Sequence, residues 1–280
     1  MMNRAISIVL ALVVLGLTAC NENMVMVPPF EAPESDRVIL MEEFTGASCP
    51  NCPAGAEQTE NMLTLYPDNL VAVAIHSDFL GFPAKPGELD LRTEAANDIE
   101  AFLGQWRSKP EAAFNRKVFS DRGEDHIRVR TQPDGWINFV QEELTTFARV
   151  YVDIETDYNR LDRTVDIVVT ATAREGLSGD FRVHVMITES GIITKQKDGS
   201  SIIDKFKQKH VLRALLTDVA GENIFSSLGP GLERQYRTSF TIPDEEDMGW
   251  WIPENMTVVA FISDGQTKEV LQAGETHIID

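Results

Sequence analysis

Two cysteines separated by two residues, in Cys49-Pro50-Asn51-Cys52, have the clearest chemical potential in this sequence. They lie between an apolar run and a stretch of helical character, a context that is typical of thiol–disulfide chemistry. The first turn of a helix offers unpaired backbone N–H groups and a dipole that stabilise a thiolate, which lowers a thiol pKa. We therefore expect Cys49 to be the exposed nucleophile at the helix start and Cys52, one turn into the helix, to resolve the mixed disulfide. Pro50 would occupy the first turn, where its missing N–H costs nothing.

Two other interpretations of this pair stay open. The cysteines could form a static disulfide, although closing so short a loop contributes little through chain entropy. A zinc site needs more ligands, and neither His76 nor His126 has ligand spacing to the pair. The sequence therefore predicts no metal and no cofactor, and it carries no serine-hydrolase, phosphate-loop or dinucleotide pattern.

The third cysteine, Cys20, ends an N-terminal targeting segment. Residues 5–17 are apolar but too short to span a membrane as a mature helix, and Leu17-Thr18-Ala19-Cys20 looks like a bacterial lipobox. We predict a lipoprotein signal peptide over residues 1–19, a lipid anchor on Cys20 and an extended tether over residues 20–36. A plain signal peptide with an unpaired cysteine is the alternative. Export implies an oxidising compartment, in which the two remaining cysteines have only each other to pair with.

Residues 37–147 are predicted to form an α/β domain around the cysteine pair. Residues 37–44 and 69–76 have the composition of buried strands, and residues 53–65 have helical character. A right-handed crossover would make the two strands parallel. The remaining elements expected in this domain are a loop over 77–89, a helix over 91–106, a strand over 112–119 and a closing helix over 136–147.

Residues 148–280 alternate apolar and polar side chains in several segments separated by turns. This pattern predicts an all-β domain, an antiparallel Ig-like sandwich, with residues 210–216 open between strand and short helix. Trp250 and Trp251 could bind a ligand, but the packing of a sandwich edge is the preferred interpretation. His210 and Arg213 are interpreted as structural or surface residues.

The charge balance excludes several partners. Lys and Arg total 25 against 44 for Asp and Glu, which gives a formal net charge of -19. Such a surface repels nucleic acid and anionic lipid, so any membrane attachment must come from the lipid anchor. The expected partners are thiols or disulfides of exported proteins, or a redox protein of the envelope.

The segment VILMEEFTGASCPNC, followed by a helix and the strand LVAVAIH, resembles the thioredoxin superfamily. The resemblance implies a buried carboxylate that assists proton transfer to the resolving thiol, at Glu43, and a cis-proline facing the disulfide, at Pro110. It also implies that the backbone of Lys109 contacts a bound peptide. Alternatively, Glu43 is a solvated residue at a strand end, and Pro110 is an ordinary trans loop proline.

The sequence departs from the thioredoxin pattern at Ser48, where the family usually has tryptophan, and in the Pro50-Asn51 spacer. Over nearly the whole chain, it resembles the Omp28 family of outer-membrane lipoproteins of Bacteroidetes-type bacteria. The lipobox, EEFTGASCPNCPAG, the NRKVF strand and the C-terminal VVAFISDGQTKEVLQA carry this second resemblance. It implies a lipid-anchored location in the outer membrane, on either its periplasmic or its surface face.

Two functions follow from these observations. The first is a thiol–disulfide oxidoreductase, or a redox-active holdase, that acts on exported proteins through Cys49, Cys52, Glu43 and Pro110. The second is a non-enzymatic surface binding or adhesion lipoprotein that uses the thioredoxin-like domain as a scaffold, because about half of the chain is predicted to form a common binding module.

Overall fold

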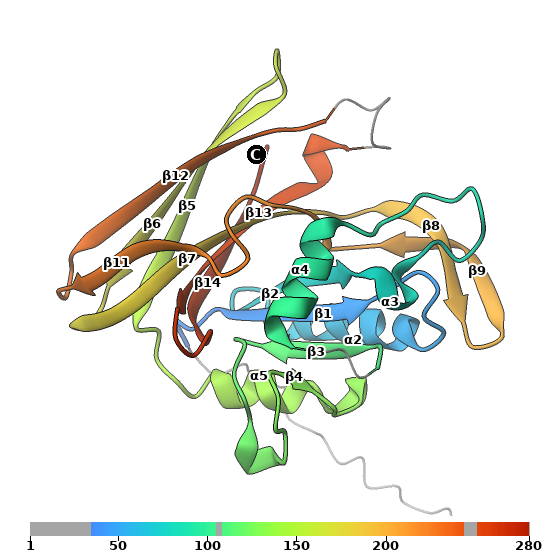
Figure 1. The fold of residues 1–280 in the computed structure, drawn as a ribbon, viewed down its shortest axis with the longest axis horizontal. Helices are drawn as coiled ribbons and strands as arrows, with labels where there is room; N and C mark the ends of the chain where they lie inside the picture. Colours follow the sequence, from blue (N-terminus) through green and yellow to red (C-terminus); the bar gives the residue numbers. More distant parts are fainter. Residues whose placement is uncertain (1–34, 105–107, 244–250, 280) are drawn as a thin grey trace, which may run out of the picture. The chain divides into compact units, whose positions relative to one another are not determined.

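The computed structural model describes residues 35–104, 108–243 and 251–279. The predicted signal peptide, Cys20, most of the tether and Trp250 lie outside the described residues. In the described ranges, strands predominate over helices (Figure 1).

The predicted strand, helix and strand around the cysteine pair are confirmed. They are β1 (Ile39–Thr45), α2 (Cys52–Leu65) and β2 (Leu70–His76). β1 and β2 are parallel and in register from Ile39 opposite Leu70 to Thr45 opposite His76. Every position of both strands is buried, because elements cover both faces of the sheet, and this is why the two strands lack a polar alternation.

The other elements of the first half are shorter than their apolar patterns indicated. The strand expected over 112–119 is only β3 (Glu111–Phe114), because Asn115 and Arg116 adopt positive φ angles of 48° and 51°. Asn115 Oδ1 there accepts the backbone N–H of Leu40 at 2.9 Å, which joins the turn to β1. The remaining elements are α3 (Asp78–Gly81) within the expected loop, α4 (Glu94–Leu103), β4 (Arg128–Val129), α5 (Ile137–Glu143) and the 3-10 turns η1 (Ser120–Arg122) and η2 (Pro133–Gly135).

The second half consists almost entirely of strands, as the alternating pattern predicts. Residues 210–216, which the sequence left open, contain a strand. The elements are β5 (Val150–Asn159), β6 (Thr164–Ala173), β7 (Leu177–Glu189), β8 (Ile192–Asp198), β9 (Ser201–Gln208), β10 (Val211–Leu215), β11 (Glu222–Leu228), β12 (Glu233–Thr241), η3 (Pro253–Asn255), β13 (Met256–Asp264) and β14 (Val270–His277).

Within the described ranges, these strands form a nine-stranded sheet, a three-stranded sheet and a two-stranded hairpin. The large sheet runs β14-β13-β7-β10-β2-β1-β3-β4, with β11 also paired to β7, and it mixes parallel with antiparallel pairs. The small sheet is the antiparallel β12-β6-β5. The hairpin is β8 with β9.

The large sheet crosses the boundary that the sequence suggests between residues 147 and 148. β10 pairs in parallel with β2, with Val211 opposite Ala74, so strands of the second half extend the sheet that carries the cysteine site. Residues 33–280 belong to one compact unit. The site can therefore contact elements from both halves of the sequence.

Apolar clusters hold these layers together. Met62 of α2 and Phe139 of α5 pack on one face of the β1–β2 region, whereas Ile99 of α4 packs on the other. The small sheet covers the remainder of the large sheet, with Ile167 and Val258 in the core between them. In Figure 1, α4 and α2 flank the strands around β1, while β12, β6 and β5 form a separate layer.

Candidate functional site

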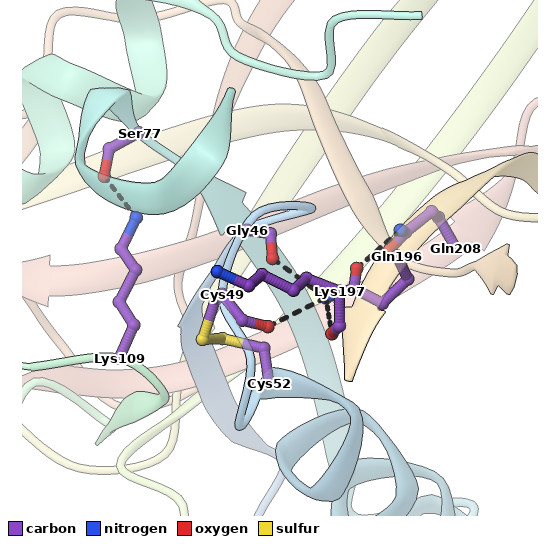
Figure 2. The surroundings of a disulfide bond; sticks show 8 residues. All are labelled: Gly46, Cys49, Cys52, Ser77, Lys109, Gln196, Lys197 and Gln208. Carbon is purple, nitrogen blue, oxygen red and sulfur yellow. Dashed lines mark hydrogen bonds between the residues drawn. A yellow bond between two sulfur atoms is a disulfide. The ribbon is translucent and has the colours of Figure 1, made fainter. Parts of the chain in front are cut away.

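The cysteine pair forms a disulfide at the junction between β1 and α2 (Figure 2). Cys49 and Cys52 are joined by an S–S bond of 2.07 Å. Helix α2 begins at Cys52 itself, with Asn51 as its N-cap and Pro53 in its first turn. The expectation that Pro50 would occupy the first turn is therefore wrong, and Cys49 lies two residues before the N-cap. Residues 46–51 form the turn between the end of β1 and the start of α2.

Neither sulfur-bearing side chain is exposed. The exposed fraction is 0% for Cys49 and 2% for Cys52. The expectation that Cys49 would be an exposed nucleophile is wrong for this structure. The reason is tertiary, since the loop of residues 46–50 is covered by the β8–β9 hairpin and by residues 80–83.

The hairpin covers the cysteine loop through hydrogen bonds to its carbonyl groups. The backbone N–H groups of Lys197 and Gly199 donate to the carbonyls of Ala47 and Pro50, each at 2.9 Å. Gln196 Nε2 lies 3.1 Å from both Gly46 O and Cys49 O, so one amide group contacts two further carbonyls. Figure 2 shows the amide of Gln196 reaching Gly46 and Cys49 from the side of the hairpin.

A second glutamine fixes the first. Gln208 Nε2 donates to Gln196 Oε1 at 3.0 Å and to Thr194 Oγ1 at 3.1 Å. All three side chains are at most 5% exposed. The interface between hairpin and loop is thus built from buried polar groups, and no single-residue pattern in the sequence pointed to Gln196 or Gln208 as part of the site.

Residues 80–83 also contact the cysteine loop. The N–H of Ser48 donates to Leu80 O at 3.1 Å, and Ser48 Oγ donates to Pro83 O at 3.2 Å. A Cβ atom on Gly46 would lie 2.2 Å from Leu80 O, which is backbone and cannot move aside cheaply. Glycine is required at position 46 for this close approach.

Glu43 is buried beneath α2 rather than solvated. Its side chain accepts a hydrogen bond from Thr59 Oγ1 at 2.9 Å, while Oε1 has no hydrogen-bond partner among the described residues. Burial raises the pKa of Glu43 to about 7, against the lowering effects of Thr59 and His210. A carboxyl group with such a pKa can hold or release a proton near neutral pH.

Its neighbour Glu42 is also buried, on the opposite face of β1. It forms a bidentate pair with Arg116, with contacts of 2.7 and 2.9 Å, and both side chains are at most 1% exposed. The guanidinium also lies over the rings of Phe102 and Phe261. Glu42 therefore has a structural partner, which leaves Glu43 as the carboxylate on the side of the disulfide.

The peptide bond between Lys109 and Pro110 is cis, as the resemblance to the thioredoxin superfamily implies. Pro110 lies against the first turns of α2, because a Cβ on Gly55 would be 3.0 Å from Pro110 Cβ and 2.8 Å from Glu43 Oε1. Gly55 is three residues after Cys52 and thus on the same face of the helix. The structure therefore brings Glu43, Pro110 and the first turn of α2 together.

The side chain of Lys109 is a feature that sequence reasoning missed. It is 6% exposed, and Nζ donates to Ser77 Oγ at 2.6 Å. Burial lowers the pKa of Lys109 to about 8. Next to it, burial and the charge of Lys109 lower the pKa of His76 to about 3, so this imidazole is neutral.

A cavity of about 420 Å³ lies between α2, the β1–β2 region and the hairpin. Its lining includes Glu43 and Cys52 from the first half of the sequence and Ile203, Phe206 and His210 from the second. His210 Nε2 lies 3.2 Å from Glu60 Oε1 on α2, which makes His210 a structural residue near the site.

The other residues singled out in the sequence lie away from the disulfide. Arg213 Nε is 3.3 Å from Glu189 Oε2, and its guanidinium lies over the Trp251 ring, which packs in the core between the two sheets. Among the described residues, no group of three or more His, Cys, Asp or Glu side chains is placed to hold a metal ion. In the same ranges, no helix is long and apolar enough to cross a membrane.

The fold and the site define a β-rich protein with a buried disulfide at a strand-to-helix junction. The family model described as outer membrane protein Omp28 matches residues 101–278. The chain belongs to the Omp28 family and is therefore an outer-membrane protein, as the resemblance predicts. The matched residues start beyond the cysteine pair, so family membership does not bear on the chemistry of Cys49 and Cys52.

Solved structures of similar fold include those of two other proteins. HBP35 of Porphyromonas gingivalis matches with a TM-score of 0.66 and 12% identity, over 88% of this chain and 76% of that chain. A protein of Agrobacterium tumefaciens matches with a TM-score of 0.50 and 13% identity, over 89% and 97% of the two chains. At these identities, the likeness concerns the fold alone.

A domain of the outer membrane lipoprotein Omp28 from Porphyromonas gingivalis matches with 20% identity and a TM-score of 0.32, over 48% of this chain and 90% of that domain. No curated protein matches the chain.

Proposed function

We propose that this outer-membrane protein is lipid-anchored through Cys20 and carries out thiol–disulfide exchange on exported proteins. In this proposal, residues 37–147 form a thioredoxin-like domain, and residues 148–280 form a sandwich that completes its surroundings. Cys49 and Cys52 are the exchanging pair, Glu43 moves the proton and Pro110 positions the target.

The observation that carries this proposal is the meeting of Glu43 and Pro110 at Gly55, one turn beyond Cys52. An inert disulfide needs neither a buried carboxyl group nor a proline against the same helix turn. Burial of this carboxyl, which raises its pKa to about 7, destabilises the ionised form, and proton transfer at neutral pH is a function that needs such a pKa. Perturbed groups of this kind cluster at functional sites.

The exchange starts from the disulfide seen in the structure. A thiolate of a target dithiol attacks one sulfur of the pair, forms a mixed disulfide with it and expels the other sulfur as a thiolate. The second target thiolate attacks the mixed disulfide, so the target leaves oxidised and Cys49 and Cys52 are left reduced. Two electrons pass from target to protein, and the two thiol protons pass to the new thiols or to solvent, with Glu43 as carrier. The reverse sequence reduces a target disulfide.

The experiment is insulin reduction by the full chain with dithiothreitol as electron donor, together with the reduction potential of the pair measured in glutathione buffers. We expect catalysis that is lost in Cys49→Ser and in Cys52→Ser. Cys20→Ser is the matched control, because it removes a thiol that the proposal places outside the reaction. Activity that survives Cys49→Ser would refute the proposal.

A second candidate is a binding or adhesion lipoprotein in which the disulfide is static. The burial of both cysteines favours it, because a sulfur with no exposed surface is not open to a thiolate. It predicts that Cys49→Ser keeps the binding of any envelope partner that the wild-type chain captures. If the cysteine variant keeps the wild-type circular dichroism spectrum but loses that partner, this candidate is excluded.

A further inference from the structure

The β8–β9 hairpin is an insertion between two strands that already pair without it. Glu189 at the end of β7 is opposite Val211 at the start of β10, so the large sheet is closed at this point. Among the described residues, β8 and β9 pair only with each other, and an isolated two-stranded hairpin is marginally stable in water. Its position over the cysteine loop therefore depends on docking.

We infer that the β8–β9 hairpin is a movable cover that occupies the place of a target polypeptide, and that an extended segment of the target replaces it during disulfide exchange. The inference rests on the proposed function and specifies the substrate class of the same site. It follows from three features of the interface, which are the spacing of its donors, its polar composition and the burial of the sulfurs.

The donors that the hairpin supplies are ones that any extended polypeptide has. The N–H groups of Lys197 and Gly199 are two residues apart and donate to Ala47 O and Pro50 O. Alternate N–H groups of an extended chain point to the same side, so a target segment can present two donors at the same interval. When the hairpin lifts, these carbonyls face either the target or water and are not left buried without a partner.

The hairpin is docked on the cysteine loop by polar groups, while Ile192 at its base packs in a small apolar cluster with Leu91 and Val211. Its face towards the loop consists of Thr194, Gln196 and Gln208, and behind it lies the cavity of about 420 Å³. The ion pair of Lys195 with Glu88, at 2.8 Å, is partly exposed and contributes little. A closely packed interface would lose many apolar contacts on opening, whereas this one exchanges hydrogen bonds with solvent.

The burial of the sulfurs makes opening a requirement for the reaction. A thiolate must reach one sulfur to form the mixed disulfide, and the exposed fractions of Cys49 and Cys52 are 0% and 2%. The observed rate of exchange is then the rate in the open form multiplied by the fraction of open molecules. A variant that weakens docking raises that fraction and leaves the cysteines unchanged.

The test is the rate at which dithiothreitol reduces the disulfide in the full chain, followed by acid quench, alkylation and mass measurement. Gln196→Ala removes the amide that contacts Gly46 O and Cys49 O, and we expect reduction to accelerate about tenfold. Replacement of residues 192–208 by two glycines should accelerate it further. The connection is feasible because Gly191 N donates to Gln208 O at 2.9 Å. Lys205→Ala, an exposed change in β9, is the matched control and should keep the wild-type rate.

Hydrogen exchange in the wild-type chain tests the same inference without requiring that any variant folds. The amides of Lys197 and Gly199 should exchange faster than those in the β7–β13 ladder, and carboxymethylated insulin B chain, an unfolded peptide without thiols, should accelerate their exchange further. Two results would overturn the inference. One is that the amides of Lys197 and Gly199 are protected from exchange as strongly as those of the β7–β13 ladder. The other is that the disulfide of the Gln196→Ala variant is reduced at the wild-type rate. If the hairpin-replaced variant is reduced rapidly but catalyses no insulin reduction, the cover is real and the proposed function fails.

Discussion

Replacement of Glu43 by glutamine tests whether the buried carboxyl titrates as its surroundings require. In the folded chain, burial raises the pKa of Glu43 from an ordinary value of 4.5 to about 7. Between these values the folded protein keeps a proton that the unfolded chain has released, so stability falls as the pH rises from about 4.5 to 7 and is constant above that. At about 1.4 kcal/mol for each pH unit, the total loss is about 3 kcal/mol.

The groups that face this carboxyl from neighbouring elements modify its pKa. Thr59 and Thr45 donate hydrogen bonds and His210 lowers the pKa of Glu43 by its charge, whereas Glu60 raises it. Burial outweighs them all. Because glutamine cannot ionise, Glu43→Gln should remove this pH dependence and be more stable than wild type at pH 8, by up to about 3 kcal/mol, while the two proteins differ little at pH 4.5.

The assay is urea unfolding of the oxidised full chain at pH 4.5, 6 and 8, with the free energy of unfolding compared between variants. Glu57→Gln, at an exposed position of α2, the helix that covers Glu43, is the matched control and should parallel wild type at all three pH values. If the difference between Glu43→Gln and wild type is the same at pH 4.5 and pH 8, the carboxyl does not have a raised pKa and the reasoning about its burial is wrong.

Three further predictions concern other parts of the chain. Gly55→Ala should destabilise the fold by about 1–3 kcal/mol in thermal or urea unfolding, because its Cβ would lie 2.8 Å from Glu43 Oε1 and 3.0 Å from Pro110 Cβ. An unchanged stability would contradict the close approach of α2 to both residues. Arg116→Met should lower the free energy of unfolding by about 3–5 kcal/mol, because it leaves Glu42 charged and buried. The double variant with Glu42→Gln should recover part of that loss, and additive losses in a double-mutant cycle would argue against a coupled pair. Cys20→Ser should abolish incorporation of labelled fatty acid and release the chain from sedimented membranes, and retention in the membrane fraction would show that another segment anchors it.

The local structure around the cysteines could be predicted because it follows from local physics. Two strand-forming segments without polar alternation, at residues 39–45 and 70–76, flank a helix, as expected of parallel strands covered on both faces. The cis bond before Pro110 was also anticipated through the family resemblance, and the structure contains it. Strand ends were predicted less well, because the end of β3 depends on the positive φ angles of Asn115 and Arg116.

The sequence by itself determined the disulfide partners, the order of β1, α2 and β2, the excess of acidic charge and the strand-rich second half. It also indicated the Omp28 family, to which the chain belongs. These features depend on residue type and short spacing. The tertiary structure alone decided that both sulfurs are buried, that burial raises the pKa of Glu43 to about 7 and that Gln196 contacts the cysteine loop from 147 residues away. The physical reason is that burial and carbonyl pairing depend on which distant segment is packed on the site. The pairing of β10 with β2 brings the β8–β9 hairpin, which directly precedes β10, to the cysteine loop.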